Sequence, residues 1–137
     1  MKNTARNLVV LVVIAMALTG LSLAQDLTYR VTANIPFDFN VDGHQLPAGS
    51  YQFEVSYGNH LVMLRNLDTG RGYDFLAIPG DGDGARGAVV EFDVYGSNHV
   101  LANLKTSDAG VDFYEKNKSE LASAWKATSV DIVASLR

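Results

Sequence analysis

Apolar and polar residues alternate along most of the chain after residue 26. An alternation with period two places the apolar side chains on one face of a β-strand, which is typical of a sheet with one buried face. We therefore predict a mainly β fold of seven or eight strands. The strand segments are 27–33, 35–41, 51–57, 73–78, 88–95, 99–104 and 130–136, together with 60–67, which is apolar more continuously. The first two are either two strands or one long strand bent near Asn34.

Residues that favour turns separate these segments. Asp42-Gly43, Pro47-Ala48-Gly49, Gly58-Asn59 and Gly96-Ser97-Asn98 combine positive-φ and φ-restricted residues at short connections. Parallel strands would need crossovers of a dozen residues or more, so the short connections predict an antiparallel meander. The segment 60–67 is apolar on both faces, so we expect it in a central, doubly covered position.

One helix is predicted near the C-terminus. Asn117 followed by Glu120 is a capping pattern, and it predicts a short helix from about Lys118 to Ala127. The strand over 130–136 then pairs with an early strand to close the sheet. Both a two-sheet sandwich and a small barrel satisfy this pattern. The uneven strand lengths, and a helix that could cap an open end, favour the sandwich or a partly open barrel.

The first residues have the three parts of a secretory signal peptide. Lys2 and Arg6 precede the apolar stretch Leu8–Leu18, and Ser22-Leu23-Ala24 places small residues at a cleavage site. About 11 apolar residues are too few to span a bilayer as a helix, which takes roughly 20. We expect cleavage after Ala24, no membrane span after that cleavage, and a single β domain over residues 25–137 that is periplasmic or secreted. The chain has no cysteine, which excludes a lipid-anchored precursor and disulfides.

Charge narrows the class of partner. Without Lys2 and Arg6, nine basic residues remain against fifteen acidic ones, a net charge of −6. Nucleic-acid binding requires a basic face, so this balance argues against it. It also disfavours electrostatic docking on anionic lipid.

Two motifs of this sequence resemble motifs of a known protein family. Ile35-Pro36-Phe37-Asp38-Phe39 and Leu46-Pro47-Ala48-Gly49-Ser50-Tyr51, followed later by Tyr95-Gly96, are similar to a family of small exported acidobacterial proteins of unknown function. The resemblance implies a secreted or periplasmic β domain, and it carries no catalytic residue or cofactor. The second motif is also similar to the turn-to-strand step of prealbumin-like sandwich modules. The chain departs from the family pattern at Leu104-Lys105 and Glu115-Lys116.

A glycine-rich loop is a candidate cation site. Asp81 and Asp83 are closely spaced carboxylates, a donor set that suits calcium. Counted from Asp81, the EF-hand positions five, six and twelve hold Ala85, Arg86 and Phe92, so that motif is absent. A solvated turn is the preferred interpretation, and a looser calcium loop is the alternative.

Histidines and aromatic residues are the remaining candidates. His60 and His99 follow similar turns, but three strands separate these turns in a meander, so we expect them at opposite ends of the sheet; His44 has no partner at useful spacing. Six aromatic residues invite comparison with a sugar-binding platform, although strand packing explains most of them. They are Tyr51, Tyr57, Tyr73, Tyr95, Tyr114 and Trp125.

The sequence contains no catalytic constellation, cofactor loop or metal cluster that we recognise. It therefore predicts no catalytic, cofactor-binding or metal-binding residues. The favoured hypothesis is a non-enzymatic exported module that acts by contact with a protein, polysaccharide or envelope surface. The alternative is a carrier that holds a small apolar molecule in a barrel interior or under the helix.

Overall fold

The computed structural model describes residues 28–82, 87–114 and 128–136, together with Ser119, Leu121 and Ser123. Strands dominate these residues, as the alternation predicts. They are β1 (Thr28–Ile35), β2 (Phe39–Val41), β3 (His44–Leu46), β4 (Gly49–Ser56), β5 (Leu61–Asn66), β6 (Gly72–Gly80), β7 (Ala88–Tyr95), β8 (Asn98–Lys105), β9 (Gly110–Phe113) and β10 (Thr128–Leu136).

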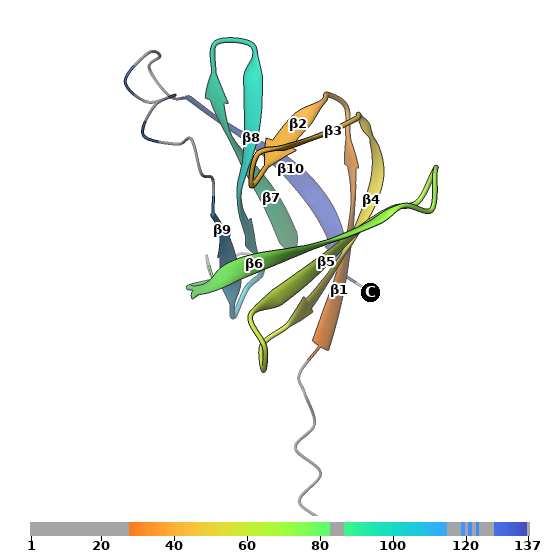
Figure 1. Cartoon of the computed structure of the whole chain (residues 1–137). Helices are drawn as coiled ribbons and strands as arrows, with labels where there is room; N and C mark the ends of the chain where they lie inside the picture. Colours follow the sequence, from red (N-terminus) through yellow and green to blue (C-terminus); the bar gives the residue numbers. More distant parts are fainter. Residues whose placement is uncertain are drawn as a thin grey trace, which may run out of the picture.

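Eight of the strands form a closed barrel (Figure 1). Around the wall the order is β1, β4, β5, β6, β9, β8, β7 and β10, and every neighbouring pair is antiparallel. The expected closure by the last strand is confirmed: Val31 and Thr32 on β1 pair with Leu136 and Ser135 on β10. Closure removes the long free sheet edges that an open sandwich would retain.

The hairpin of β2 and β3 is an addition to the barrel wall. It lies at the upper end in Figure 1, and β2 runs parallel to β8 through the single pair Asn40 and Val100. Phe39, Val41 and Leu46 of this hairpin are each at most 1% exposed. The hairpin therefore contributes apolar side chains to the barrel core.

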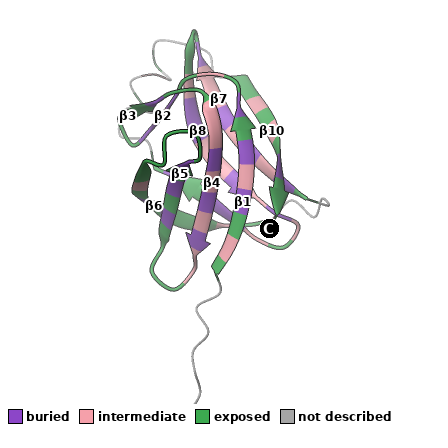
Figure 2. Cartoon of the chain, turned by 90° about the vertical axis from the view of Figure 1, so that its right-hand side faces the viewer, coloured by how far each residue is buried: buried purple, intermediate pink, exposed green. Residues whose placement is uncertain are grey.

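The core follows from the alternation along each strand. Figure 2 shows buried residues alternating with more exposed ones along β1 and β4. Their inward residues are packed against those of the other strands, and the largest fully buried side chains include Tyr51, Tyr95, Phe39, Phe53 and Phe92. An eight-stranded barrel is narrow enough for such side chains to fill its interior.

The structure corrects several expectations. Of the two architectures left open, the two-sheet sandwich is wrong and the barrel is confirmed, although the barrel is closed rather than partly open. The simple meander is also wrong after β6: this strand pairs with β5 and β9, while β7 pairs with β8 and β10. The strand after Asn59 is not doubly covered, since residues alternate between exposed and buried along β5.

Two other predictions, the signal peptide and the C-terminal helix, concern residues that the structure does not describe or describes only in part. The signal peptide lies in residues 1–27, outside the described part of the chain. Of the helix predicted over 118–127, only Ser119, Leu121 and Ser123 are described, so both features stay predictions. Across the described residues, we find no helix with the length and apolar character needed to cross a membrane.

Candidate functional site

The two family-like motifs come together in the fold. The backbone N–H of Ala48 donates to Asp38 Oδ1 at 2.8 Å, and the Tyr51 hydroxyl donates to the Pro47 carbonyl oxygen at 2.6 Å. The Phe39 ring packs edge-on against Tyr51, with ring centroids 5.2 Å apart. The motifs therefore hold the β2–β3 hairpin against the start of β4.

A turn after β5 supports the same region. Asn66 is 2% exposed, and its Oδ1 accepts from the N–H groups of Asp68 and Thr69, each at 2.9 Å. Asp68 Oδ2 in turn accepts from the Ser50 N–H at 2.9 Å. These side chains satisfy backbone donors that strand pairing leaves free, which is a structural role.

The three histidines do not converge on one site. Figure 1 places the β4–β5 turn, which contains His60, at the lower end of the barrel and the β7–β8 turn at the upper end. His99 stacks on Phe37 with centroids 3.9 Å apart, and His44 Nδ1 lies 3.1 Å from the Asp42 carbonyl oxygen. Among the described residues, no three histidine or carboxylate side chains group as metal ligands would.

The candidate calcium loop is described only in part. Asp83 lies outside the described residues, whereas Asp81 and Gly82 lie within them. A Cβ on Gly82 would lie 2.6 Å from both the Ala109 nitrogen and the Ser107 carbonyl oxygen. This half of the loop is therefore packed tightly on the turn before β9, and calcium binding by Asp81 and Asp83 stays a hypothesis.

The tyrosines do not form a continuous aromatic platform. Tyr51 and Tyr95 are 0% and 2% exposed, so both belong to the interior. Tyr57 and Tyr73 are half-buried, and Tyr114 is exposed. Trp125 lies outside the described residues. The sugar-binding interpretation is therefore wrong for the two buried rings.

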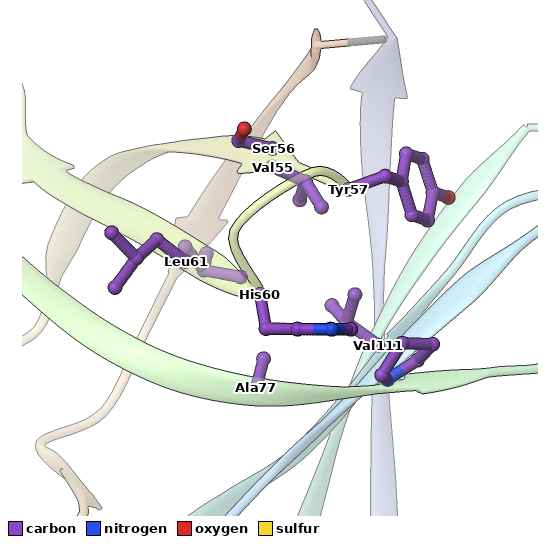
Figure 3. Close-up of a pocket in the computed structure, with 9 residues that line it drawn as sticks. Val55, Ser56, Tyr57, His60, Leu61, Ala77 and Val111 are labelled. Atoms are coloured by element: carbon purple, nitrogen blue, oxygen red, sulfur yellow. The ribbon is translucent and has the colours of Figure 1, made fainter. Parts of the chain in front are cut away.

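A small pocket lies beside the β4–β5 turn, which is at the lower end of the barrel in Figure 1; Figure 3 shows the residues that line it. Val55, Tyr57, His60, Ala77 and Val111 are among the residues that line it. Its volume of about 10 Å³ leaves room for one water molecule at most. Ligand pockets usually have several hundred cubic ångströms, so this pocket does not accommodate an organic molecule as it stands.

Two phenols near this end are incompletely satisfied. The rings of Tyr29 and Tyr57 lie with centroids 5.4 Å apart, and both hydroxyl oxygens are buried without a well-formed hydrogen bond among the described residues. Burial raises the pKa of Tyr29 far above its ordinary value, and the neighbouring Tyr57 phenol raises it further. Tyr29 therefore stays protonated across the neutral and mildly alkaline range.

An apolar patch lies on the outer face of β5 and β6. We call it the outer patch; it consists of Leu61, Met63, Leu76 and Ile78, which are 37%, 47%, 70% and 60% exposed. Leu61 pairs directly with Leu76, and cross-strand partners point to the same face. The four side chains therefore project together into solvent.

A groove adjoins the outer patch. Its volume is about 260 Å³, and it is lined by Thr28, Glu54, Ser56, Asn59, Leu61, Met63 and Asp74. The strand register explains this set, because Glu54 on β4 and Asp74 on β6 both pair with Met63 on β5. Met63 thus lies between two carboxylates, and we call this feature the acidic groove.

The charges around the acidic groove differ in their partners. Glu54 Oε2 accepts from Arg30 Nε at 2.8 Å, and this bond lowers the pKa of Glu54. The Asp74 carboxylate has no hydrogen bond or ion pair with any described residue. Arg65 lies two residue pairs further along β5 than Met63, where it is opposite Gly72, and does not line the groove. Asp74 is therefore the carboxylate whose charge is available to a partner.

Comparison of the chain with protein-family models, with curated proteins and with solved structures finds no match. The resemblance to exported acidobacterial proteins is not tested by these comparisons and remains a hypothesis.

The outer patch was not predicted as a surface. The apolar residues on both faces of 60–67 indicated full burial, since the same pattern is typical of strands covered on both sides. The structure leaves one of those faces exposed. The unusual signal, apolar residues at outward positions, was present in the sequence, but it does not tell a covered face from a contact surface.

Proposed function

We propose that this protein is an exported, non-enzymatic contact module that binds a partner protein through the outer patch. The observation that carries the proposal is the gathering of Leu61, Met63, Leu76 and Ile78 on one exposed face of two adjacent strands. Contiguous apolar side chains at the surface of a soluble domain mark interaction sites, whereas single exposed ones need no explanation.

The chemistry of the outer patch favours a protein partner over a glycan. The four side chains are aliphatic or thioether groups that offer neither a flat aromatic ring nor hydrogen bonds to sugar hydroxyls. Large apolar anchors that dock on a complementary apolar surface are typical of protein interfaces.

A carrier function has less support. The pocket of Figure 3 has a volume of about 10 Å³, and large side chains such as Phe53, Phe92 and Leu104 occupy the core. The other proposed location, under the predicted helix, falls mostly outside the described residues. The contact module is therefore the better-supported proposal.

Site-specific photocrosslinking in the native host tests this function. A photoreactive phenylalanine analogue replaces Leu76 in the outer patch, and in a matched control it replaces Val133, an outward residue of β10 that is 83% exposed. We expect a discrete adduct with another protein from position 76 and none of that mass from position 133. The adduct should form again from the two purified proteins and should weaken when Ile78→Ser is introduced.

Two results would contradict the proposal. Equal adducts from both positions would indicate non-specific contact, and no adduct from position 76 in envelope or medium would indicate that the outer patch has no partner. An adduct of twice the chain's own mass would identify a second copy as the occupant and exclude a heterologous partner.

A further inference from the structure

We infer that the acidic groove binds a basic, amphipathic segment of the partner, with a lysine or arginine side chain lying across Met63. This inference rests on the proposed function and adds the chemistry of the partner. It is argued from the shape, register and charge of the outer face of β4, β5 and β6.

The register forms two rows of outward residues across four strands. One row contains Thr28, Ser56, Leu61 and Leu76, and the next contains Arg30, Glu54, Met63 and Asp74. Directly opposed residues in such rows have Cβ atoms about 5 Å apart. Apolar and acidic side chains are therefore close neighbours on this face.

These rows match the two parts of a basic side chain. Lysine and arginine have an aliphatic stem that packs on apolar surface and a charged end that stays hydrated or paired. Met63 and Leu61 offer the apolar floor, and Asp74 and Glu54 flank it on either side. A single long cationic side chain thus satisfies both features of the groove.

Charge complementarity favours this occupant over others. Both charged residues that line the groove are acidic, and the chain as a whole has a net charge of −4. Arg30 is already bonded to Glu54, which leaves the Asp74 carboxylate without a counter-ion among the described residues. An acidic or phosphate-bearing partner would meet repulsion here, whereas a basic one also gains a faster encounter.

Two synthetic peptides test the inference on the protein cleaved after Ala24. In the first, seven residues alternate lysine and leucine; in the second, glutamate replaces each lysine. Binding is followed at low salt by amide chemical shifts in ¹⁵N-labelled protein. We expect the lysine peptide to shift the signals of Glu54, Leu61, Met63 and Asp74 and to bind at least tenfold more tightly than the glutamate peptide.

Single-residue variants distinguish binding in the acidic groove from general attraction between opposite charges. Asp74→Asn should weaken binding of the lysine peptide about three- to fivefold, as expected for an exposed ion pair. Asp131→Asn removes the same charge from β10, where Asp131 is exposed, and should change the affinity less than 1.5-fold. Met63→Gln should weaken binding about fivefold through loss of apolar contact.

The outcomes distinguish this inference from the proposed function. Equal effects of Asp74→Asn and Asp131→Asn, or equal binding of both peptides, would overturn the inference that the partner segment is basic. If the crosslink at position 76 still forms with another protein in that case, the contact function stands. If the lysine peptide maps to the groove but no crosslink forms in the host, the groove chemistry stands and the contact function fails.

Discussion

Gly49 packs closely against the carboxylate of Asp68. A Cβ at position 49 would lie 2.7 Å from Asp68 Oδ2, the same oxygen that accepts a hydrogen bond from the Ser50 N–H at 2.9 Å. Gly49 also has a φ of +156°, which side chains rarely adopt. The glycine of the Leu-Pro-Ala-Gly-Ser-Tyr motif is therefore required by close packing at the first residue of β4.

We predict that Gly49→Ala lowers the free energy of unfolding by about 1–3 kcal/mol, because the methyl group displaces the Asp68 carboxylate from Ser50. Urea unfolding measures the change. Gly72→Ala is the control, since a Cβ at Gly72 meets no atom within 4 Å. An equal loss in both variants would show that the contact with Asp68 is not the cause.

Phe39→Ala should cost about 3–5 kcal/mol of unfolding free energy, as large-to-small changes in a core do. Phe39 is 0% exposed, and its ring packs edge-on against Tyr51 and Phe92. Leu76→Ala, at a side chain 70% exposed, should stay within about 0.5 kcal/mol of the native protein. A loss below about 1 kcal/mol for Phe39→Ala would contradict the burial of the β2–β3 hairpin.

Tyr51→Phe should destabilise the protein by about 0.5–1.5 kcal/mol, the usual net contribution of one hydrogen bond. The substitution removes the part-buried 2.6 Å bond from the Tyr51 hydroxyl to the carbonyl oxygen of Pro47, a residue that is itself exposed. Thermal and urea unfolding at neutral pH measure this loss. Unchanged stability would show that water replaces the missing hydroxyl at no cost.

Tyr29→Phe should have the opposite effect at neutral pH, since it removes a buried hydroxyl without a well-formed partner. We expect stability equal to or greater than that of the native chain. Burial raises the pKa of Tyr29 in the folded state. Ionisation of this phenol therefore leaves the free energy of unfolding unchanged below about pH 10 and lowers it as the pH rises further.

Tyr29 also makes the free energy of unfolding depend on pH in the alkaline range. Above about pH 10 the unfolded phenol loses its proton while the folded one keeps it, so the native protein should lose stability with rising pH. Tyr29→Phe should reduce that slope between pH 10 and 11. A slope identical to the native one would show that Tyr29 ionises equally easily in both states.

The exported form should begin at Gln25. Cleavage after Ala24 follows from the small residues Ser22 and Ala24 behind the apolar stretch Leu8–Leu18. Intact-mass measurement on protein recovered from the envelope and medium of the native host should give the mass of residues 25–137. A mass that includes residues 1–24 would contradict the signal peptide.

Much of the fold could be predicted because strand alternation is a local property. The segment 88–95 matches β7 residue for residue, and the buried face that the alternation predicts for 35–41 and 51–57 is confirmed at Phe39, Tyr51 and Phe53. The short strands β3 and β9 were missed, since three or four residues are too few for a period-two pattern to stand out. The candidate site was less predictable than the fold.

What the sequence determined by itself is which residues form strands, where most turns lie and which side chains face inward, because these depend on neighbours along the chain. Only the tertiary structure decided that β6 pairs with β9, that β2 lies parallel to β8 and that the sheet closes into a barrel. The tertiary structure also placed Met63 between Glu54 and Asp74. The physical reason is that a strand's inner face needs apolar residues whichever strand lies beside it, so the pattern along the chain does not specify the partner.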